Sequence, residues 1–189
     1  MDIPYGSNEA AKFVTNVGLI TSDGPNGPNV MAVEWTHQIA YKPGLIAISV
    51  HPADATAENI QATKEFGVNI AAEDQNTISS IAGGSHGQRV DKVGVLKELG
   101  IEFYDAKKIK APMVKGAVLN AECKVVFSKD FGDHTLFIGE AVDVSIADKE
   151  PLLYHGGKYF KVGEHVTKPG QETMDKIKIL TEKHAKHFD

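Results

Sequence analysis

Hydrophobic and polar positions along the chain repeat mostly with the short period of β-strands. Strand-like runs cover residues 17–22, 30–36, 45–50 and 66–71. The turn-forming sequence GPNGP at residues 24–28 lies between the first two runs, which predicts an antiparallel hairpin. The run LIAISV at 45–50 is apolar on both faces, as expected of a barrel strand that is covered inside and outside.

Two longer strand-like segments follow later in the chain. Residues 117–127 and 134–146 are separated by the turn-rich SKDFGD, so they predict one long hairpin. Helical spacing of apolar residues, with capping residues at the ends, predicts several helices. These helices cover residues 7–16, 54–65, 76–83, 91–100 and 171–188.

About six strands with interposed helices define the expected fold class. We expect a mainly β protein with helical insertions, built as an antiparallel, Greek-key-like barrel and not as a doubly wound parallel sheet. With 189 residues and 42% hydrophobic composition, a single domain is expected at residues 1–163, with 164–189 as its C-terminal helical extension. That extension carries a helical stripe, which predicts a surface helix or a helix that clasps a dimer. The stripe consists of Met174, Ile177, Leu180 and His184.

Charge and composition argue against several classes of function. The formal net charge is −5 and the 20 lysines and arginines are scattered, so no nucleic-acid partner is expected. The longest mostly apolar run, residues 44–50, is too short to span a bilayer, and the N-terminus lacks the pattern of a signal peptide. A cytoplasmic protein with no membrane partner is therefore expected. The single cysteine, Cys123, lies in a strand-like run, which indicates a buried, inert thiol.

Several catalytic motifs are missing from the sequence. The eight histidines do not have the spacing of a metal site, and the close pair His184 and His187 is better explained as exposed tail residues. The GGSHG run lacks the closing GK[ST] of a phosphate-binding P-loop, and no G-x-S-x-G of a serine hydrolase is present. Metal, nucleotide-hydrolysing and serine hydrolase chemistry are therefore disfavoured.

Three stretches of sequence carry a resemblance to a known family. They are NVMAVEWTHQIAYKPGLIAISVHPADATAENI (29–60), GSHGQRVDKV (84–93) and GDHTLFIGEAVDV (132–144). The third is the most specific, because ordinary strand composition seldom produces a Gly-Asp-His-Thr turn that runs into LFIGEAVDV. Through these stretches the chain resembles the flavin reductase-like, or flavoredoxin-type, family over residues 8–159.

The resemblance implies a split β-barrel that binds FMN at a homodimer interface, with the flavin laid against the strand at 29–36. It also implies an oxidoreductase that takes electrons from a nicotinamide, NADH or NADPH, or from a redox protein. Bound FMN would pass them to a flavin, ferric or protein acceptor. A non-catalytic FMN-binding protein or electron carrier is the main alternative, and an oxidase of a small substrate is a third.

Residues near the ribityl phosphate are also implied by the resemblance. The position of one of them, Thr56, suits phosphate binding, because it lies near the start of a predicted helix, where free backbone N–H groups favour an anion. The alternative is that Thr56 and Asp54 only cap this helix. The implied phosphate residues are Ser49, Val50, His51, Thr56 and Asn59.

The glycine-rich loop offers further phosphate donors. Ser85 supplies a hydroxyl, and Arg89 and Lys92 supply two cations, a set that can close over a phosphate. A solvated surface loop is the alternative interpretation.

An apolar bed for the flavin ring is expected on the strand at 30–36. Its side chains come from Met31, Ala32, Val33 and Trp35, while the backbone as far as Thr36 can donate hydrogen bonds to the ring. Trp35 as core filler is an equally natural interpretation.

Two residues bear on the electron transfer itself. His134 in the GDHT turn is the candidate catalytic residue, since the matching family histidine faces the flavin and the nicotinamide or substrate pocket; a turn imidazole bonded to Asp133 is the alternative. Glu34 replaces the small residue that robust family reductases usually have. A carboxylate near the flavin would oppose the anionic reduced form, unless Glu34 points outward.

Overall fold

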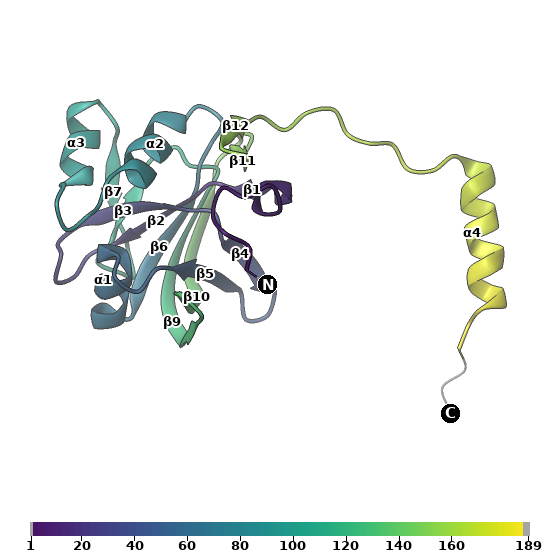
Figure 1. Cartoon of the computed structure of the whole chain (residues 1–189), viewed down its shortest axis with the longest axis horizontal. Helices are drawn as coiled ribbons and strands as arrows, with labels where there is room; N and C mark the ends of the chain where they lie inside the picture. The colour runs from purple at the N-terminus through teal and green to yellow at the C-terminus, as the bar shows by residue number, and fades with distance from the viewer. Residues whose placement is uncertain (1, 187–189) are drawn as a thin grey trace.

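The computed structural model describes residues 2–186 and shows a mainly β fold around one seven-stranded sheet (Figure 1). The strands lie in the order β3-β2-β6-β9-β10-β5-β4, and every neighbouring pair is antiparallel. This arrangement confirms the predicted class. The strands are β2 (Gly18–Ser22), β3 (Asn29–Val33), β4 (Thr36–Ala40), β5 (Leu45–Val50), β6 (Glu65–Ile70), β9 (Leu119–Phe131) and β10 (His134–Ile146).

The two edges of this sheet meet at a corner formed by Glu34 and Trp35. β3 and β4 are the outermost strands on opposite sides, yet only these two residues separate them in the chain. The sheet therefore curls until its edges approach, and the Ser49 N–H donates to the Trp35 carbonyl (3.1 Å). The Thr36 hydroxyl fixes the corner by donating to the Val33 carbonyl (3.0 Å). The result agrees with the expected split barrel.

The interior of the curled sheet holds the main hydrophobic core. Ile20, Ile48, Phe66 and Phe137 are all fully buried there, together with Cys123. Burial raises the pKa of the Cys123 thiol to about 12, so the thiol is inert as expected.

The helices and short strands surround this core. α1 (Ala55–Thr63) follows β5 and packs Ala57 and Ile60 into the main core. A second core lies between β3 and the next two helices, with Val30, Ile78 and Leu96 at its centre. These elements are α2 (Asn76–Gly84) and α3 (Lys92–Glu98), and the short strands are β1 (Thr15–Asn16), β7 (Phe103–Asp105), β8 (Pro112–Val114), β11 (Leu153–His155) and β12 (Lys158–Phe160).

Some of the predicted elements are wrong. The helix expected at 7–16 is reduced to a 3₁₀ turn, η1 (Ala10–Lys12), because Thr15 and Asn16 instead pair with β11 as strand β1. The strand expected at 30–36 stops at Val33, and Thr36 begins β4. This edge strand was missed because its sequence THQIA is mostly exposed and polar, without a hydrophobic alternation.

Beyond β12 the chain leaves the body of the protein. Residues 161–170 run without regular structure to α4 (Gln171–Lys183), which stands clear of the sheet (Figure 1). The predicted tail helix is therefore present but ends at Lys183, and its last expected residues, 187 and 188, lie outside the described residues. The division of the chain at residue 163 stays a prediction. Within residues 2–186, no helix is long and apolar enough to cross a membrane.

Candidate functional site

A large cleft opens along β3 and the Glu34–Trp35 corner. Its volume is about 950 Å³, comparable with the ~300–1,000 Å³ of typical ligand sites. Four parts of the chain form it: the N-terminal segment, β3 with the corner, the end of β5, and the turn between β9 and β10. Its predicted members are Met31, Ala32, Val33, Glu34, Trp35, Ser49, Val50, His51 and His134.

The edge of β3 supplies backbone groups to this cleft. β3 is the outermost strand of its side and pairs with β2 along its inner edge. Within residues 2–186 no further strand pairs with its outer edge, so backbone groups on that edge can bind a ligand. Met31, Ala32 and Val33 all line the cleft, so a planar heterocycle there would meet both apolar side chains and backbone donors.

An aromatic group closes the corner end of the cleft. The Trp35 and His134 ring centroids lie 4.7 Å apart, and the His51 ring meets His134 edge-on at 6.0 Å. The Trp35 side chain is half exposed (51%), which rules out the interpretation as core filler. Its exposed face is available to a ring-shaped ligand.

His134 lies at the start of β10, directly after the hairpin turn. Its Nδ1 is 2.8 Å from the Asp133 carboxylate, so the simple turn contact exists, and that contact lowers the pKa of Asp133. His134 nevertheless lines the cleft. With Nδ1 occupied by the carboxylate, Nε2 is the nitrogen left for a ligand.

A smaller polar pocket of about 140 Å³ adjoins the cleft at Ala32. Thr56, Ser85 and Lys92, three of the predicted phosphate donors, line it. The loop after α2 packs tightly to complete this pocket: a Cβ on Gly87 would lie 2.6 Å from Asn29 Oδ1 and 2.9 Å from the Ala55 Cβ. The structure thus brings Thr56 and Lys92, which lie 36 positions apart in the chain, to one pocket.

Lys92 is the only lysine or arginine that lines this pocket, within the part of the chain that the structure describes. It is 2% exposed, and its Nζ donates to the Ala82 carbonyl at 3.0 Å. Burial lowers the pKa of Lys92 to about 8, although the nearby Asp54 carboxylate opposes the shift. An ammonium group has three N–H donors. Besides the bond to the Ala82 carbonyl, two N–H groups of Lys92 can donate hydrogen bonds to an anion.

The N-terminus of α1 faces the same pocket. Asp54, in the N-cap position, makes no capping hydrogen bond with its side chain. The Thr56 hydroxyl accepts from Asn29 Nδ2 (2.8 Å) and does not cap the helix either. The interpretation of both residues as helix caps is therefore wrong, and the first-turn N–H groups and the helix dipole remain for an anion.

Glu34 lies on the cleft wall and does not point wholly outward. It is half-buried and lines both the main cleft and a neighbouring hollow of about 390 Å³. Burial raises the pKa of its carboxyl group. A ligand that covers Glu34 would remove it further from water and strengthen this effect.

Three predicted site residues have other surroundings. Thr36 is buried behind the corner and lines neither the cleft nor the polar pocket. Asn59 is fully buried, where it accepts from the Asn26 N–H (2.9 Å) and donates to the Gly27 carbonyl (2.9 Å), so it holds the loop between β2 and β3. Arg89 is exposed and lines neither hollow. Their direct roles in binding stay predictions without geometric support.

The structure also adds residues that the sequence did not point to. Tyr5 and Phe13 of the N-terminal segment line the main cleft, and Asn29 orients Thr56 in the polar pocket. No periodicity marks the N-terminal pair, whereas Asn29 opens the strand NVMAV and was recognisable only as a polar residue before an apolar run. Within residues 2–186, no group of three metal-ligating side chains comes together.

The structure thus combines a curled antiparallel sheet with a cleft along its edge and a smaller polar pocket beside that cleft. The model of the flavin reductase like domain matches residues 10–163. The chain belongs to this family, which confirms the resemblance seen in the sequence.

Individual relatives agree with this membership. The FMN reductase (NADH) SmoA of Agrobacterium fabrum is 25% identical over 80% of this chain and 82% of its own length. The structure of flavin reductase PheA2 is 30% identical, with a TM-score of 0.72, over 87% of this chain and all of that chain. Flavoredoxin from Methanosarcina acetivorans shares the fold with a TM-score of 0.77 at 23% identity, over 94% of this chain and 99% of that chain.

Proposed function

We propose that this protein is an FMN-dependent flavin reductase that oxidises a nicotinamide nucleotide, NADH by likeness to SmoA, and works as a homodimer. The acceptor is a free flavin, and the redox chemistry is that of the bound FMN. A cytoplasmic location belongs to the same proposal and agrees with a lone, buried thiol.

The observation that supports FMN most directly is the polar pocket next to the cleft. A phosphate needs cationic and N–H donors, and the pocket combines Lys92 Nζ with the uncapped start of α1. The flavin ring needs an apolar bed and backbone donors, which the outer edge of β3 and Trp35 provide. The residues present therefore fit FMN at both of its ends.

The size of the polar pocket favours FMN over FAD as the resident flavin. About 140 Å³ suits one terminal phosphate, and the buried Lys92 lies within its wall. In FAD the same phosphate carries a further nucleotide, which would have to leave the pocket past the loop at 85–87. Riboflavin lacks the phosphate altogether, so it serves as a control ligand.

The aromatic corner supports reduction by a nicotinamide. Asp133 holds His134 through Nδ1, so that Nε2 can orient a second ligand beside the flavin. His51 and the exposed Trp35 form the adjoining wall. In this proposal His134 positions the donor and Thr56 and Lys92 hold the cofactor.

The experiment is a titration of the purified protein with FMN, FAD and riboflavin, followed by assays of NADH and NADPH oxidation. FMN should bind stoichiometrically, and Thr56→Val should weaken FMN but not riboflavin, by about 1.5–3 kcal/mol for a lost charge-assisted hydrogen bond. Thr63→Val, at the other end of α1, is the matched control. Tight FMN binding without any nucleotide oxidation would instead indicate an electron carrier, and no FMN binding would refute the proposal.

A further inference from the structure

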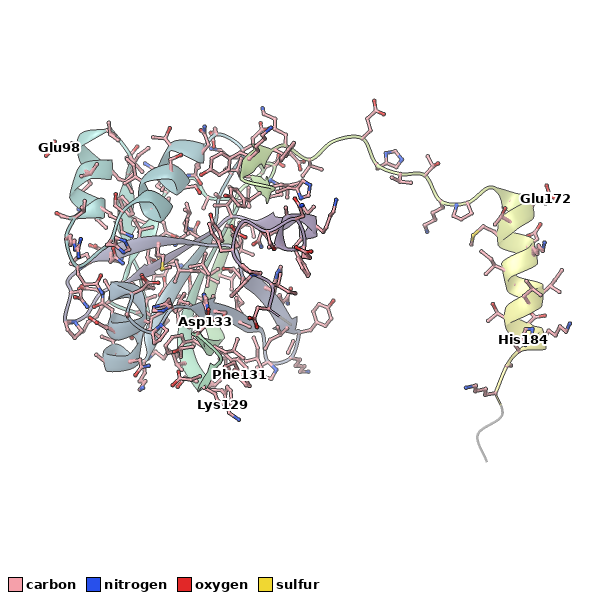
Figure 2. The ribbon with its side chains drawn as sticks, viewed as in Figure 1. Glu98, Lys129, Phe131, Asp133, Glu172 and His184 are labelled. Atoms are coloured by element: carbon pink, nitrogen blue, oxygen red, sulfur yellow. The ribbon has the colours of Figure 1, made fainter. Side chains whose placement is uncertain are left out.

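The apolar side chains of the C-terminal arm, residues 161–186, do not pack against the described body of the protein. All its residues are exposed, from the linker at 161–170 to the end of α4. Met174, Ile177 and Leu180 recur every three residues and are 40–46% exposed. Figure 2 shows Glu172 and His184 at the two ends of this helix, far from the sheet. The apolar stripe is thus unpartnered.

An isolated helix of this length needs a partner to persist. α4 has 13 residues, and helices shorter than ~12–15 residues are marginal in water because nucleation is unfavourable. Its stripe is the kind of amphipathic surface that becomes stable when it packs against an apolar partner.

The body of the protein carries a matching surface, which we call the open face. It is a cleft of about 250 Å³ on the sheet, and no Lys, Arg, Asp or Glu lines it. The cleft is smaller than a typical cofactor site. Asn16, Thr36, His37 and Gln38 also line it, and its apolar members suit aliphatic side chains. Its half-buried and exposed apolar members are Ile46, Ile70, Leu119, Ala141 and Val144.

The direction and reach of the arm indicate that the open face it covers lies on a second copy of this chain. The linker spans ten residues, 161–170, which extend to at most about 35 Å. The arm runs away from its own sheet (Figure 1). The matched span with the Methanosarcina flavoredoxin covers 94% of the 189 residues, about 178, so it includes part of the arm beyond residue 163. The alignment with this structure therefore extends into the arm.

We propose that α4 of each chain crosses to a second copy of this chain and covers its open face with Met174, Ile177 and Leu180. The inference rests on the homodimer of the proposed function. Reciprocal exchange of identical arms satisfies two-fold symmetry and covers both faces at once. It removes two exposed apolar surfaces from water in each half of the dimer.

The test uses site-specific cross-linking in the full chain. Because Cys123 is the only cysteine, is fully buried and has a pKa raised to about 12, introduced thiols react alone. Ile177→Cys and Val144→Cys chains are prepared separately, mixed to exchange subunits, and treated with a short bismaleimide. Two matched controls exist: Ile179→Cys lies about 200° around the helix from Ile177, and Val126→Cys has the same 54% exposure as Val144 but lies outside the open face.

The expected product is a covalent dimer linked between residues 177 and 144 of different chains, with much lower yield from either control. A link that forms only within a chain carrying both substitutions would overturn the exchange, because the arm would then fold back. Sedimentation distinguishes failure of the arm exchange from failure of the homodimer. If the protein is a dimer but cross-links no more than the controls, the arm exchange is refuted and the homodimer stands. If the protein is a monomer, both proposals are refuted. Independently, Ile177→Asp should weaken dimerisation at least about tenfold, and Ile179→Asp should leave it unchanged.

Discussion

Replacing Lys92 by methionine should abolish a pH dependence of FMN binding that the structure predicts for the parent protein. The ammonium group is 2% exposed, and burial lowers its pKa from 10.5 to about 8. A phosphate dianion favours the charged amine, so FMN binds the protonated form. The phosphate itself loses its second proton near pH 6 and stays a dianion above pH 7. Lys92 is therefore the group that should titrate in this window.

The magnitude follows from proton linkage. Above pH 8, each further pH unit leaves about a tenth as much protonated Lys92 in the free protein, so FMN affinity should fall by up to about tenfold per unit. At pH 7 the Lys92→Met variant should bind FMN more weakly by about 1.5–3 kcal/mol, and its affinity should not change between pH 8 and 10. Riboflavin should show no such dependence with either protein.

The lowered pKa of Lys92 also predicts how the stability of the apoprotein changes with pH. Between pH 8 and 10.5 the unfolded chain holds a proton on Lys92 that the folded chain has released. Stability should therefore rise with pH in this window, by at most about 3 kcal/mol from this group, and Lys92→Met should lack the rise. Flavin fluorescence titrations and urea unfolding from pH 7 to 10.5 measure both effects, with the exposed Lys97→Met as the control. If FMN affinity still falls with pH in Lys92→Met, Lys92 is not the titrating group.

Three further predictions concern the rest of the site. His134→Asn should keep its FMN content but slow flavin reduction by NADH by about 10²-fold, because the donor is no longer held in position, while stopped-flow reduction by dithionite stays normal; an equal slowing with dithionite would show that His134 does not position the donor. Glu34→Gln should raise the reduction potential of bound FMN, because it removes a half-buried carboxylate that opposes the anionic reduced flavin, whereas Glu98→Gln on the far end of α3 (Figure 2) should not. Asn59→Ala should cost about 1–3 kcal/mol of stability by leaving buried groups unpaired, seen as a lower urea midpoint; a selective loss of FMN over riboflavin would instead support a phosphate role.

Much of the fold could be predicted because its strands carry local signals. The hairpin at GPNGP and the long β9–β10 hairpin have turn formers between apolar runs, and the structure has both. β4 could not be predicted in this way, since its partner β5 and the corner at Trp35 define it and its own residues are polar. Thr15 and Asn16 likewise become a strand through pairing with β11, far away in the chain.

The candidate site was predictable to the extent that its residues share a motif. Thr56 and Lys92 carry donor chemistry on recognisable segments, and the structure brings them to one pocket. The motif could not distinguish Thr56 from Asn59, because both are fully buried and only tertiary packing directs Asn59 to the β2–β3 loop while Thr56 lines the pocket. Nor could it show that Lys92 is buried while Arg89 is exposed. Side-chain direction is set by contacts that are distant in sequence.

The most direct test of the proposed function is the anaerobic mixing of FMN-loaded protein with one equivalent of NADH, followed by absorbance in a stopped-flow instrument. We predict that NADH bleaches the long-wavelength flavin band of the bound FMN in a fast phase. A flavin-loaded protein whose band is unchanged by both NADH and NADPH, yet is bleached by dithionite, would contradict it.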